Sequence, residues 1–372
     1  MDLSPSPEQR LLIESARTFL ARTCPIEHVR AMEADERGFD PEHWRQITAL
    51  GWTGLTLPAT LAGSGQSFFD LALLLEEAGR VLLPEPLLVT CGIAAPLLLA
   101  CDDGEERRRC LRAIATGGAV VTLALLEPDG RDEWQESALD ARHDNGAIRL
   151  RGIKRLVPFA PHADVVLVPA RLADEGTCLL SVANDAPGVS RRRQRVFGLD
   201  PVYEMRFDDV RVPPQAMIAH GDTAAAAIES ARLHAAVASL AYLAGAAARA
   251  LEMTVEYADT RVQFGRPIGA FQAVAHRCVD MLSDVEALRY LVYQAAWSLA
   301  TGQSSEVEVG VAKAYGNEAL RRIFANAHQV HGAIGFSTEY DLQLFTRRAK
   351  AAELQWGSTA VHRERVARAM GL

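Results

Sequence analysis

Two segments in the second half of the chain contain residue types that hold ligands. The first runs from Arg261 to Gln272, and the second includes Gln329, His331 and Gly332. An arginine presents a planar fork of donors for bidentate contacts, and a glycine lets the backbone approach a ligand closely. His331 has no cluster of Cys, His or Asp residues beside it, so we expect it to pack or to hydrogen-bond. The motifs give no support to a metal site.

The same two segments carry a family resemblance. Residues 261–272 and 329–348 resemble the corresponding motifs of acyl-CoA dehydrogenases, and residues 51–58, 127–128 and 207–213 resemble further stretches of that family. The resemblance therefore covers nearly the whole chain. It implies an FAD-dependent enzyme that removes two hydrogens across the Cα–Cβ bond of an acyl-CoA thioester. A carboxylate takes the Cα proton, while the Cβ hydride passes to FAD.

Carried over residue by residue, the resemblance implies cofactor contacts made across a subunit interface. Arg261 resembles the arginine that reaches the flavin pyrophosphate of a neighbouring subunit. Phe264, Phe271 and Gln272 stand where the family packs or hydrogen-bonds the nucleotide end, although both phenylalanines could equally be plain core. Two further residues resemble the loop that closes over the adenine side of the same flavin; they are Gln329 and Gly332.

The motifs that would hold the chain's own flavin are altered. Many members of the family carry Thr-Glu-Pro followed by Gly-Ser-Asp, but here Leu126 replaces the hydroxyl donor and the tail is absent from residues 129–132. A second motif normally supplies a tryptophan and a threonine next to the flavin ring. Leu156 and Pro158 stand in those two positions, and proline lacks even a backbone N–H.

The expected catalytic base is also missing. The resemblance places it at Trp356, whose indole cannot accept a proton from carbon and whose bulk would fill the space for the acyl chain. The alternative position on the helix that opens the last domain offers Ala235 or Tyr242, and neither is a carboxylate. We therefore predict no catalytic residue in this chain. A self-sufficient enzyme would have to use Glu353 or Glu339 instead, of which we expect Glu339 to pair with the helix carrying Arg347 and Arg348.

The residues retained are those that one subunit lends to another. We therefore predict the non-catalytic half of a heteromeric acyl-CoA dehydrogenase of α2β2 composition, with a homologous partner that carries the glutamate. Steroid-type acyl-CoA is the substrate class that the resemblance favours, and an electron-transfer flavoprotein is the acceptor it implies. Two alternatives stay open: a homo-oligomeric enzyme with a non-standard base, and a flavin-free acyl-CoA-binding protein.

The order of the expected elements agrees with this family. Ser6, Pro7 and Gln9 form a capping-box pattern that starts a helical first third. Short apolar runs and the Asn145-Gly146 turn then predict strands. Long apolar helices follow over residues 224–258, 271–301, 305–330 and 347–370. We predict an α+β multidomain fold: a helical domain (1–118), a small β-barrel or sandwich (119–220) and a four-helix bundle (221–372).

Composition limits the environment and the partners. A net charge of −8 argues against a nucleic-acid partner. The basic run 190–195 is typical of a solvated ribbon, with contact to a CoA phosphate as the alternative. Six dispersed cysteines suit a reducing compartment rather than disulfides or zinc. Neither a signal peptide nor a membrane span is indicated, so we expect a cytoplasmic protein.

Overall fold

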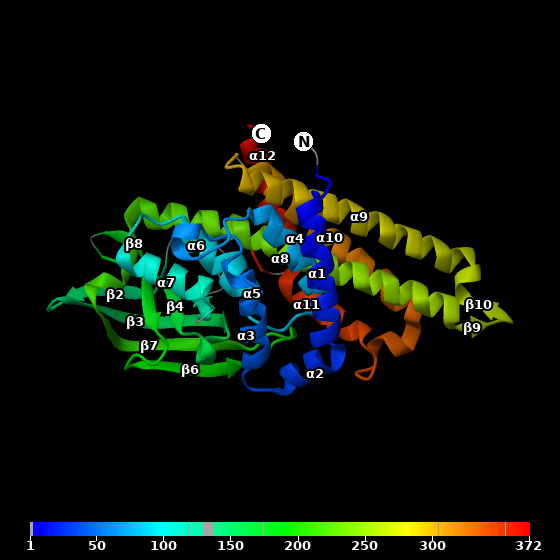
Figure 1. Ribbon diagram of the computed structural model, residues 1–372, viewed down its shortest axis with the longest axis horizontal. Coiled ribbons are helices and arrows are strands. Elements are labelled where there is room, and N and C mark those ends of the chain that lie inside the picture. Colours follow the sequence, from blue (N-terminus) through cyan, green and yellow to red (C-terminus); the bar gives the residue numbers. More distant parts are fainter. Residues whose placement is uncertain (1–2, 118, 129–136, 174, 304, 354) are drawn as a thin grey trace.

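The computed structural model describes residues 3–117, 119–128, 137–173, 175–303, 305–353 and 355–372. Helices of the first third cover one side of the molecule, strands gather at one end, and long helices form the other end (Figure 1). This arrangement confirms the predicted fold class.

Some of the N-terminal helices begin where a polar side chain caps them. The hydroxyl of Ser6 accepts from the backbone N–H of Gln9, and the side-chain oxygen of Gln9 accepts from the backbone N–H of Ser6. The predicted capping box is therefore confirmed. The side chain of Asp40 accepts from the backbone N–H of Glu42 and caps the helix that starts at Pro41. The short helix α2 was not predicted, because Pro25 precedes it and offers no side-chain cap. The helices are α1 (Pro7–Thr23), α2 (Ile26–Ala34), α3 (Pro41–Ala49), η1 (Trp52–Gly54), η2 (Ala59–Leu61), α4 (Phe68–Arg80), α5 (Leu87–Val89), η3 (Thr90–Ala94), α6 (Ala95–Leu99) and α7 (Glu105–Ala115).

The middle of the chain forms one eight-stranded sheet. Its order is β6-β7-β3-β2-β4-β5-β8, and β1 pairs with β4. Asn145 and Gly146 both have positive φ and join β2 to β3, which confirms the predicted hairpin. The basic run lies on the edge strand β6. The strands are β1 (Val121–Leu123), β2 (Asp140–Asp144), β3 (Ala147–Pro158), β4 (Val165–Leu172), β5 (Gly176–Ala183), β6 (Val189–Gln194), β7 (Val202–Val212) and β8 (Met217–His220), with η4 (Ala160–His162) and η5 (Pro214–Ala216) between them.

Three of the four predicted C-terminal helices are confirmed, and the fourth prediction is wrong. The expected helix 347–370 is divided into α11 and α12, because Trp356 (φ 64°) and Gly357 (φ 97°) leave the right-handed helical region. Ser358 then caps α12. The elements are α8 (Gly221–Thr260), β9 (Val262–Gln263), β10 (Arg266–Pro267), η6 (Ile268–Ala270), α9 (Gln272–Ala300), α10 (Glu306–His331), η7 (Gly332–Phe336), α11 (Leu342–Glu353) and α12 (Thr359–Ala369).

Helix α8 is the axis of the molecule and runs from the sheet to the β9–β10 hairpin (Figure 1). Among the described helices it alone is long and apolar enough to cross a membrane, but 89% of that apolar window is buried within the chain. It packs closely on α4: a Cβ added to Gly245 would lie 1.8 Å from the carbonyl oxygen of Glu76. The two helices therefore fix the N-terminal helices against the bundle.

Candidate cofactor site

Two side-chain contacts bring the predicted cofactor residues to one end of the bundle. Arg277 on α9 donates to Asn326 on α10 over 2.8 Å, which aligns the start of α9 with the end of α10. Tyr257 on α8 stacks on His331 with ring centroids 4.6 Å apart. Because Arg261 follows Tyr257 by one helical turn, the residues from both motifs lie at neighbouring helix ends.

Arg261 and Gln272 are exposed at this end. The backbone N–H of Arg261 donates to Tyr257 over 2.8 Å, which ends α8, but within the described residues its guanidinium has no hydrogen bond or ion pair. Gln272 is the first residue of α9, and Phe271 before it provides no side-chain cap. In the first turn of α9 the N–H of Val274 donates to the carbonyl of Phe271 over 2.9 Å, which leaves the N–H groups of the first two residues for a ligand. Such N–H groups and an unpaired guanidinium are chemistry that suits a phosphate.

The two phenylalanines differ in environment. Phe264 is 91% exposed at the tip of the β9–β10 hairpin, so the core alternative is wrong for this residue. Phe271 is half-buried; it meets Phe264 edge to face at 6.0 Å and lies under the guanidinium of Arg266 at 4.2 Å. The pair forms an aromatic surface next to Gln272.

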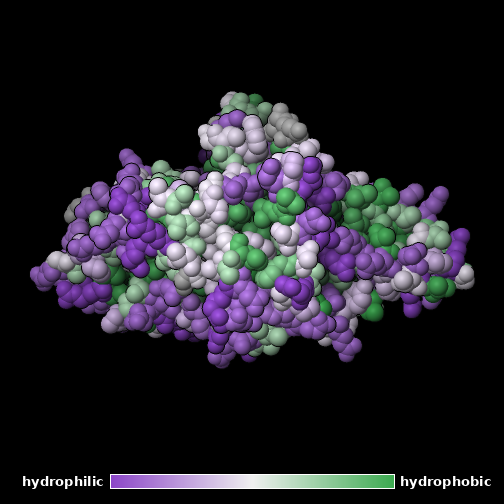
Figure 2. Space-filling model, in the orientation of Figure 1, coloured by the Kyte–Doolittle hydropathy of each residue, from purple (hydrophilic) through white to green (hydrophobic). Residues whose placement is uncertain are grey.

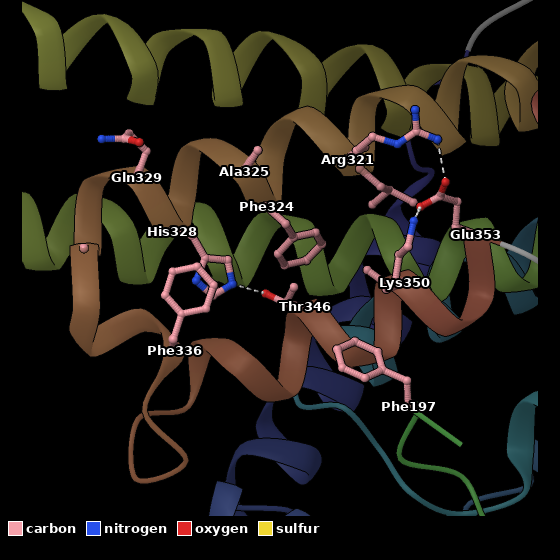
Figure 3. Close-up of a pocket in the computed structure, with 13 residues that line it drawn as sticks. Phe197, Arg321, Phe324, Ala325, His328, Gln329, Phe336, Thr346, Lys350 and Glu353 are labelled. Atoms are coloured by element: carbon pink, nitrogen blue, oxygen red, sulfur yellow. Dashed lines mark hydrogen bonds and ion pairs between the residues drawn. The ribbon is translucent and has the colours of Figure 1, made fainter. Parts of the chain in front are cut away.

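Gln329 and Gly332 line a cavity of about 580 Å³ between α10 and α11 (Figure 3). Gly332 has φ 65° and ψ −141°, a conformation nearly restricted to glycine, and no atom stands within 4 Å of the position a Cβ would take. Aromatic side chains furnish much of the wall, and Phe336 stacks on His328 at 4.3 Å. The other lining residues are Phe197, Leu320, Arg321, Phe324, Ala325, Thr346, Ala349, Lys350 and Glu353.

The carboxylate in this cavity is neutralised rather than available as a base. Glu353 accepts from Arg321 over 2.5 Å and from Lys350 over 2.9 Å, at the end of the cavity opposite Gln329 (Figure 3). Burial alone would raise the pKa of Glu353, but the hydrogen bonds from Lys350 and Arg321 outweigh it and the pKa is lowered. A carboxylate held in this way is a weak proton acceptor.

The other alternative base occupies an exposed turn. The expectation that Glu339 pairs with the helix carrying Arg347 and Arg348 is wrong, because those arginines instead bind Glu33 and Asp200. The two pairs connect α11 to α2 and to the loop before β7.

Trp356 lies in the break between α11 and α12. It is half-buried against the apolar core, and its carbonyl accepts from Nε2 of His362 over 2.7 Å. Buried Asn317 donates to the next carbonyl, that of Gly357, over 3.4 Å. Ala235 and Tyr242 are buried on α8, and the phenol of Tyr242 donates to the carbonyl of Leu83. None of the three residues at the positions expected for the base, Trp356, Ala235 and Tyr242, carries a carboxylate.

The β-domain motif has kept a structural pair that the sequence did not reveal. Lys154 is 1% exposed and forms a buried ion pair with Glu127, and Ser137 donates to the same carboxylate over 2.8 Å. Next to it, Leu156 is exposed with φ 51° in an irregular part of β3, and its N–H bonds to Gln194. The altered stretch 129–132 lies outside the described residues. Glu127 and Lys154 are therefore explained by packing, without a cofactor.

His331 is a packing residue, as predicted. It is 4% exposed, its Nδ1 contacts the carbonyl of Ala327 at 2.8 Å, and its Nε2 lies 3.1 Å from the hydroxyl of Tyr340. Burial lowers the pKa of its imidazole.

Comparison with known proteins agrees with this geometry. Residues 6–118 match the acyl-CoA dehydrogenase N-terminal domain, and residues 221–371 match the C-terminal domain. Acyl-CoA dehydrogenase FadE27 of Mycobacterium tuberculosis is 30% identical, with 94% of each chain covered.

Solved structures show the same architecture. The ChsE4–ChsE5 complex of Mycobacterium tuberculosis has a TM-score of 0.90 at 28% identity, covering 100% of this chain and 99% of that one. The Tcur3481–Tcur3483 steroid ACAD has a TM-score of 0.88 at 29% identity and covers 99% of both. PigA, solved with FAD and proline, has a TM-score of 0.92 at 25% identity with full coverage of both. The chain belongs to the FAD-dependent acyl-CoA dehydrogenase family.

Proposed function

We propose that this chain is the non-catalytic subunit of a heteromeric acyl-CoA dehydrogenase and lends flavin contacts to a homologous partner. The observation that carries the proposal is the combination of two facts. Tryptophan occupies the position expected for the base, while Arg261 and Gln272 are exposed and the guanidinium of Arg261 has no partner within the described residues. A cofactor bound across an interface would explain both.

The distribution of these residues in the molecule supports the proposal. Phe264 projects from the β9–β10 hairpin, at the end of α8 away from the chain's own sheet (Figure 1). Hydrophobic side chains also lie on the exposed side of α9, where Val279 is 58% and Leu282 is 48% exposed (Figure 2). An apolar surface next to unpaired polar groups is typical of a protein interface.

In this assembly, the chain's residues position the cofactor and leave the chemistry to the partner. Arg261 and the first turn of α9 would bind the pyrophosphate, while Gln329 and Gly332 would contact the adenine side. FAD, when bound, accepts the hydride. The partner would supply the carboxylate that removes the Cα proton, and it would hold the flavin ring with its own β-domain.

Similar structures support a proposal for the substrate class. Two of the similar structures pair two different chains, and one of them is a steroid ACAD. They support an assembly of unlike chains acting on a bulky, steroid-type acyl-CoA, for which we propose an α2β2 composition. We further propose an electron-transfer flavoprotein as the acceptor and the cytoplasm as the location.

The visible absorbance spectrum tests the proposal. The chain is purified alone, and then after co-expression with a homologous acyl-CoA dehydrogenase chain that carries the glutamate. We expect a colourless lone chain and a yellow pair that bleaches when acyl-CoA is added. A lone chain that holds flavin and bleaches with substrate would refute the heteromer, whereas a colourless pair would favour the flavin-free binding protein.

A variant of the pair then examines the remaining carboxylate. Glu353→Gln should bleach at the wild-type rate, because Arg321 and Lys350 already neutralise that side chain. A loss of about 100-fold or more would instead identify Glu353 as the general base.

A further inference from the structure

A buried cluster of metal-ligating side chains lies where α1, α2 and α3 meet the turn between α4 and α5. Cys24 ends α1, His28 lies on α2, His43 lies on α3, and Glu85 belongs to the turn. The thiol of Cys24, a ring nitrogen of His28 and a carboxylate oxygen of Glu85 are all within 4.8 Å of one another. His43 lies just outside this group of three, and its Nδ1 is 2.8 Å from Oε1 of Glu85, which makes it the candidate for a fourth ligand.

Glu85 is incompletely bonded for its depth. Its side chain is 0% exposed, and Oε1 alone takes both imidazoles, with His28 Nε2 at 3.0 Å. The second oxygen, Oε2, is buried and has no hydrogen-bond partner among the described residues. A buried carboxylate oxygen without a partner is costly, so the cluster has unused capacity for a cation.

The hydroxyl of Thr23 fixes His43 in the tautomer that a metal needs. Thr23 donates its proton to the carbonyl of Phe19 over 2.9 Å, so its oxygen must accept from Nε2 of His43, 3.0 Å away. Nε2 therefore carries a hydrogen, and once the proton between Nδ1 and Glu85 is lost, the neutral ring directs the lone pair of Nδ1 at the cluster. Ligating histidines are usually oriented by such a bond from the opposite ring nitrogen.

We propose that Cys24, His28, His43 and Glu85 form a structural site for a divalent transition-metal ion, with zinc as the best match. One thiolate, two imidazoles and one carboxylate are a ligand set that zinc accepts in tetrahedral geometry. The charges also balance, because two anionic ligands neutralise the dication. On binding, the S–H proton of Cys24 is released to solvent as the S–Zn bond forms. The protons that now join Glu85 to the imidazoles are also released to solvent, because the ion takes their place.

The surroundings indicate a structural rather than a catalytic role. Four protein ligands leave no open coordination position. The side chain of His28 is 16% exposed and gives the ion a path from solvent. In the turn that carries Glu85, the carbonyl of Leu83 also accepts a hydrogen bond from the hydroxyl of Tyr242 on α8. An ion here would connect the three N-terminal helices to the turn that contacts the central helix, independently of the proposed flavin function.

Metal content and cobalt spectroscopy test this site. The untagged full-length chain is treated with a chelator, and its metal is measured by mass spectrometry before and after zinc is restored and excess ion is dialysed away. Cobalt(II) is titrated into the chelated chain in parallel. We expect about one zinc per chain and the absorbance bands of thiolate-bound, tetrahedral cobalt.

Variants identify the ligands. Cys24→Ser should abolish the thiolate–cobalt band, and Glu85→Gln should lower affinity at least about 10-fold. Cys278→Ser is the matched control, because this half-buried thiol on α9 lies outside the cluster and should leave the spectrum unchanged. No retained zinc and no cobalt band in the wild-type chain would overturn the proposal. Equal metal binding by Cys24→Ser would also overturn the proposal, since the ion would then be adventitious. The wild-type measurement does not depend on the variants, so a variant that fails to fold leaves the test intact.

Discussion

At the scale of single residues, a buried lysine and a buried asparagine on α10 bond to the backbone on either side of Trp356. Lys313 on α10 is fully buried; its Nζ donates to Asn317 over 2.7 Å and to the carbonyl of Ala352 over 3.3 Å. Asn317 in turn bonds to Gly357, so this pair holds both sides of the break between α11 and α12. Burial lowers the pKa of the Lys313 ammonium from 10.5 to about 7, while Glu353 opposes that shift.

Lys313 should therefore make stability depend on alkaline pH. Between pH 7 and 10.5 the unfolded chain binds more protons at this lysine than the folded chain, so its contribution to the unfolding free energy rises with pH. The loss caused by Lys313→Met should then grow from pH 7 to pH 10, by an amount on the order of 5 kcal/mol at most. The other nearby group, His362, has a pKa of about 4 and stays neutral in this range.

Urea unfolding of the two proteins at both pH values measures this difference. Lys350→Met, at an exposed lysine, should show no such growth. A constant difference between wild type and Lys313→Met would mean that Lys313 keeps its charge in the folded chain.

At the scale of elements, two hairpins with the same turn show what a sequence can and cannot reveal. Asn145-Gly146 was predicted because Asn and Gly tolerate positive φ at both central positions. The β9–β10 turn also has two positive φ values, 52° at Phe264 and 78° at Gly265, but a phenylalanine is disfavoured there. Sequence patterns predict the backbone conformation that each residue prefers locally, and Phe264 does not adopt the conformation it prefers.

The same distinction explains the other differences. Capping residues and apolar periodicity predicted α1, α8, α9 and α10, whose signals are local. The break after α11 depends on buried partners far away in sequence, such as Asn317. The cofactor residues could be predicted only through motif resemblance, and their convergence required the contact between Arg277 and Asn326. The cluster around Glu85 could not be predicted from the sequence, because its side chains come from separate elements.

Strain at an exposed aromatic side chain indicates a role in assembly. Phe264→Asn should leave the lone chain at least as stable, by about 0–1 kcal/mol, because asparagine suits the turn. The same change should weaken binding to the partner subunit about 10- to 100-fold by removing an aromatic contact. Differential scanning calorimetry and sedimentation of the pair measure the two effects, with Leu11→Asn as the control at a 67% exposed position on α1. Unchanged association would remove Phe264 from the interface.

At the scale of the whole molecule, the retained and missing motifs would make the assembly that we propose asymmetric. The chain offers Arg261 at one end, while its own sheet carries Leu156 and Pro158 where the family places flavin contacts. A flavin site that needs both sets of contacts would be complete only where the helical bundle of this chain meets the sheet of the partner. The expected content is therefore one FAD for each pair of chains, rather than one for each chain.

Substitution of the same arginine in each subunit tests this asymmetry. Arg261→Gln should remove most of the flavin, because the buried pyrophosphate loses a charge-assisted bidentate contact worth about 1.5–3 kcal/mol. The equivalent change in the partner should have no effect, since the site it would serve lacks flavin contacts on this chain's sheet. Arg322→Gln serves as the control, because Arg322 is paired with Asp284 away from the hairpin. Flavin absorbance per mole of assembly, with native mass spectrometry for the subunit count, gives the answer. Equal losses from both substitutions would show two equivalent sites, and the chain would then be a catalytic equal of its partner.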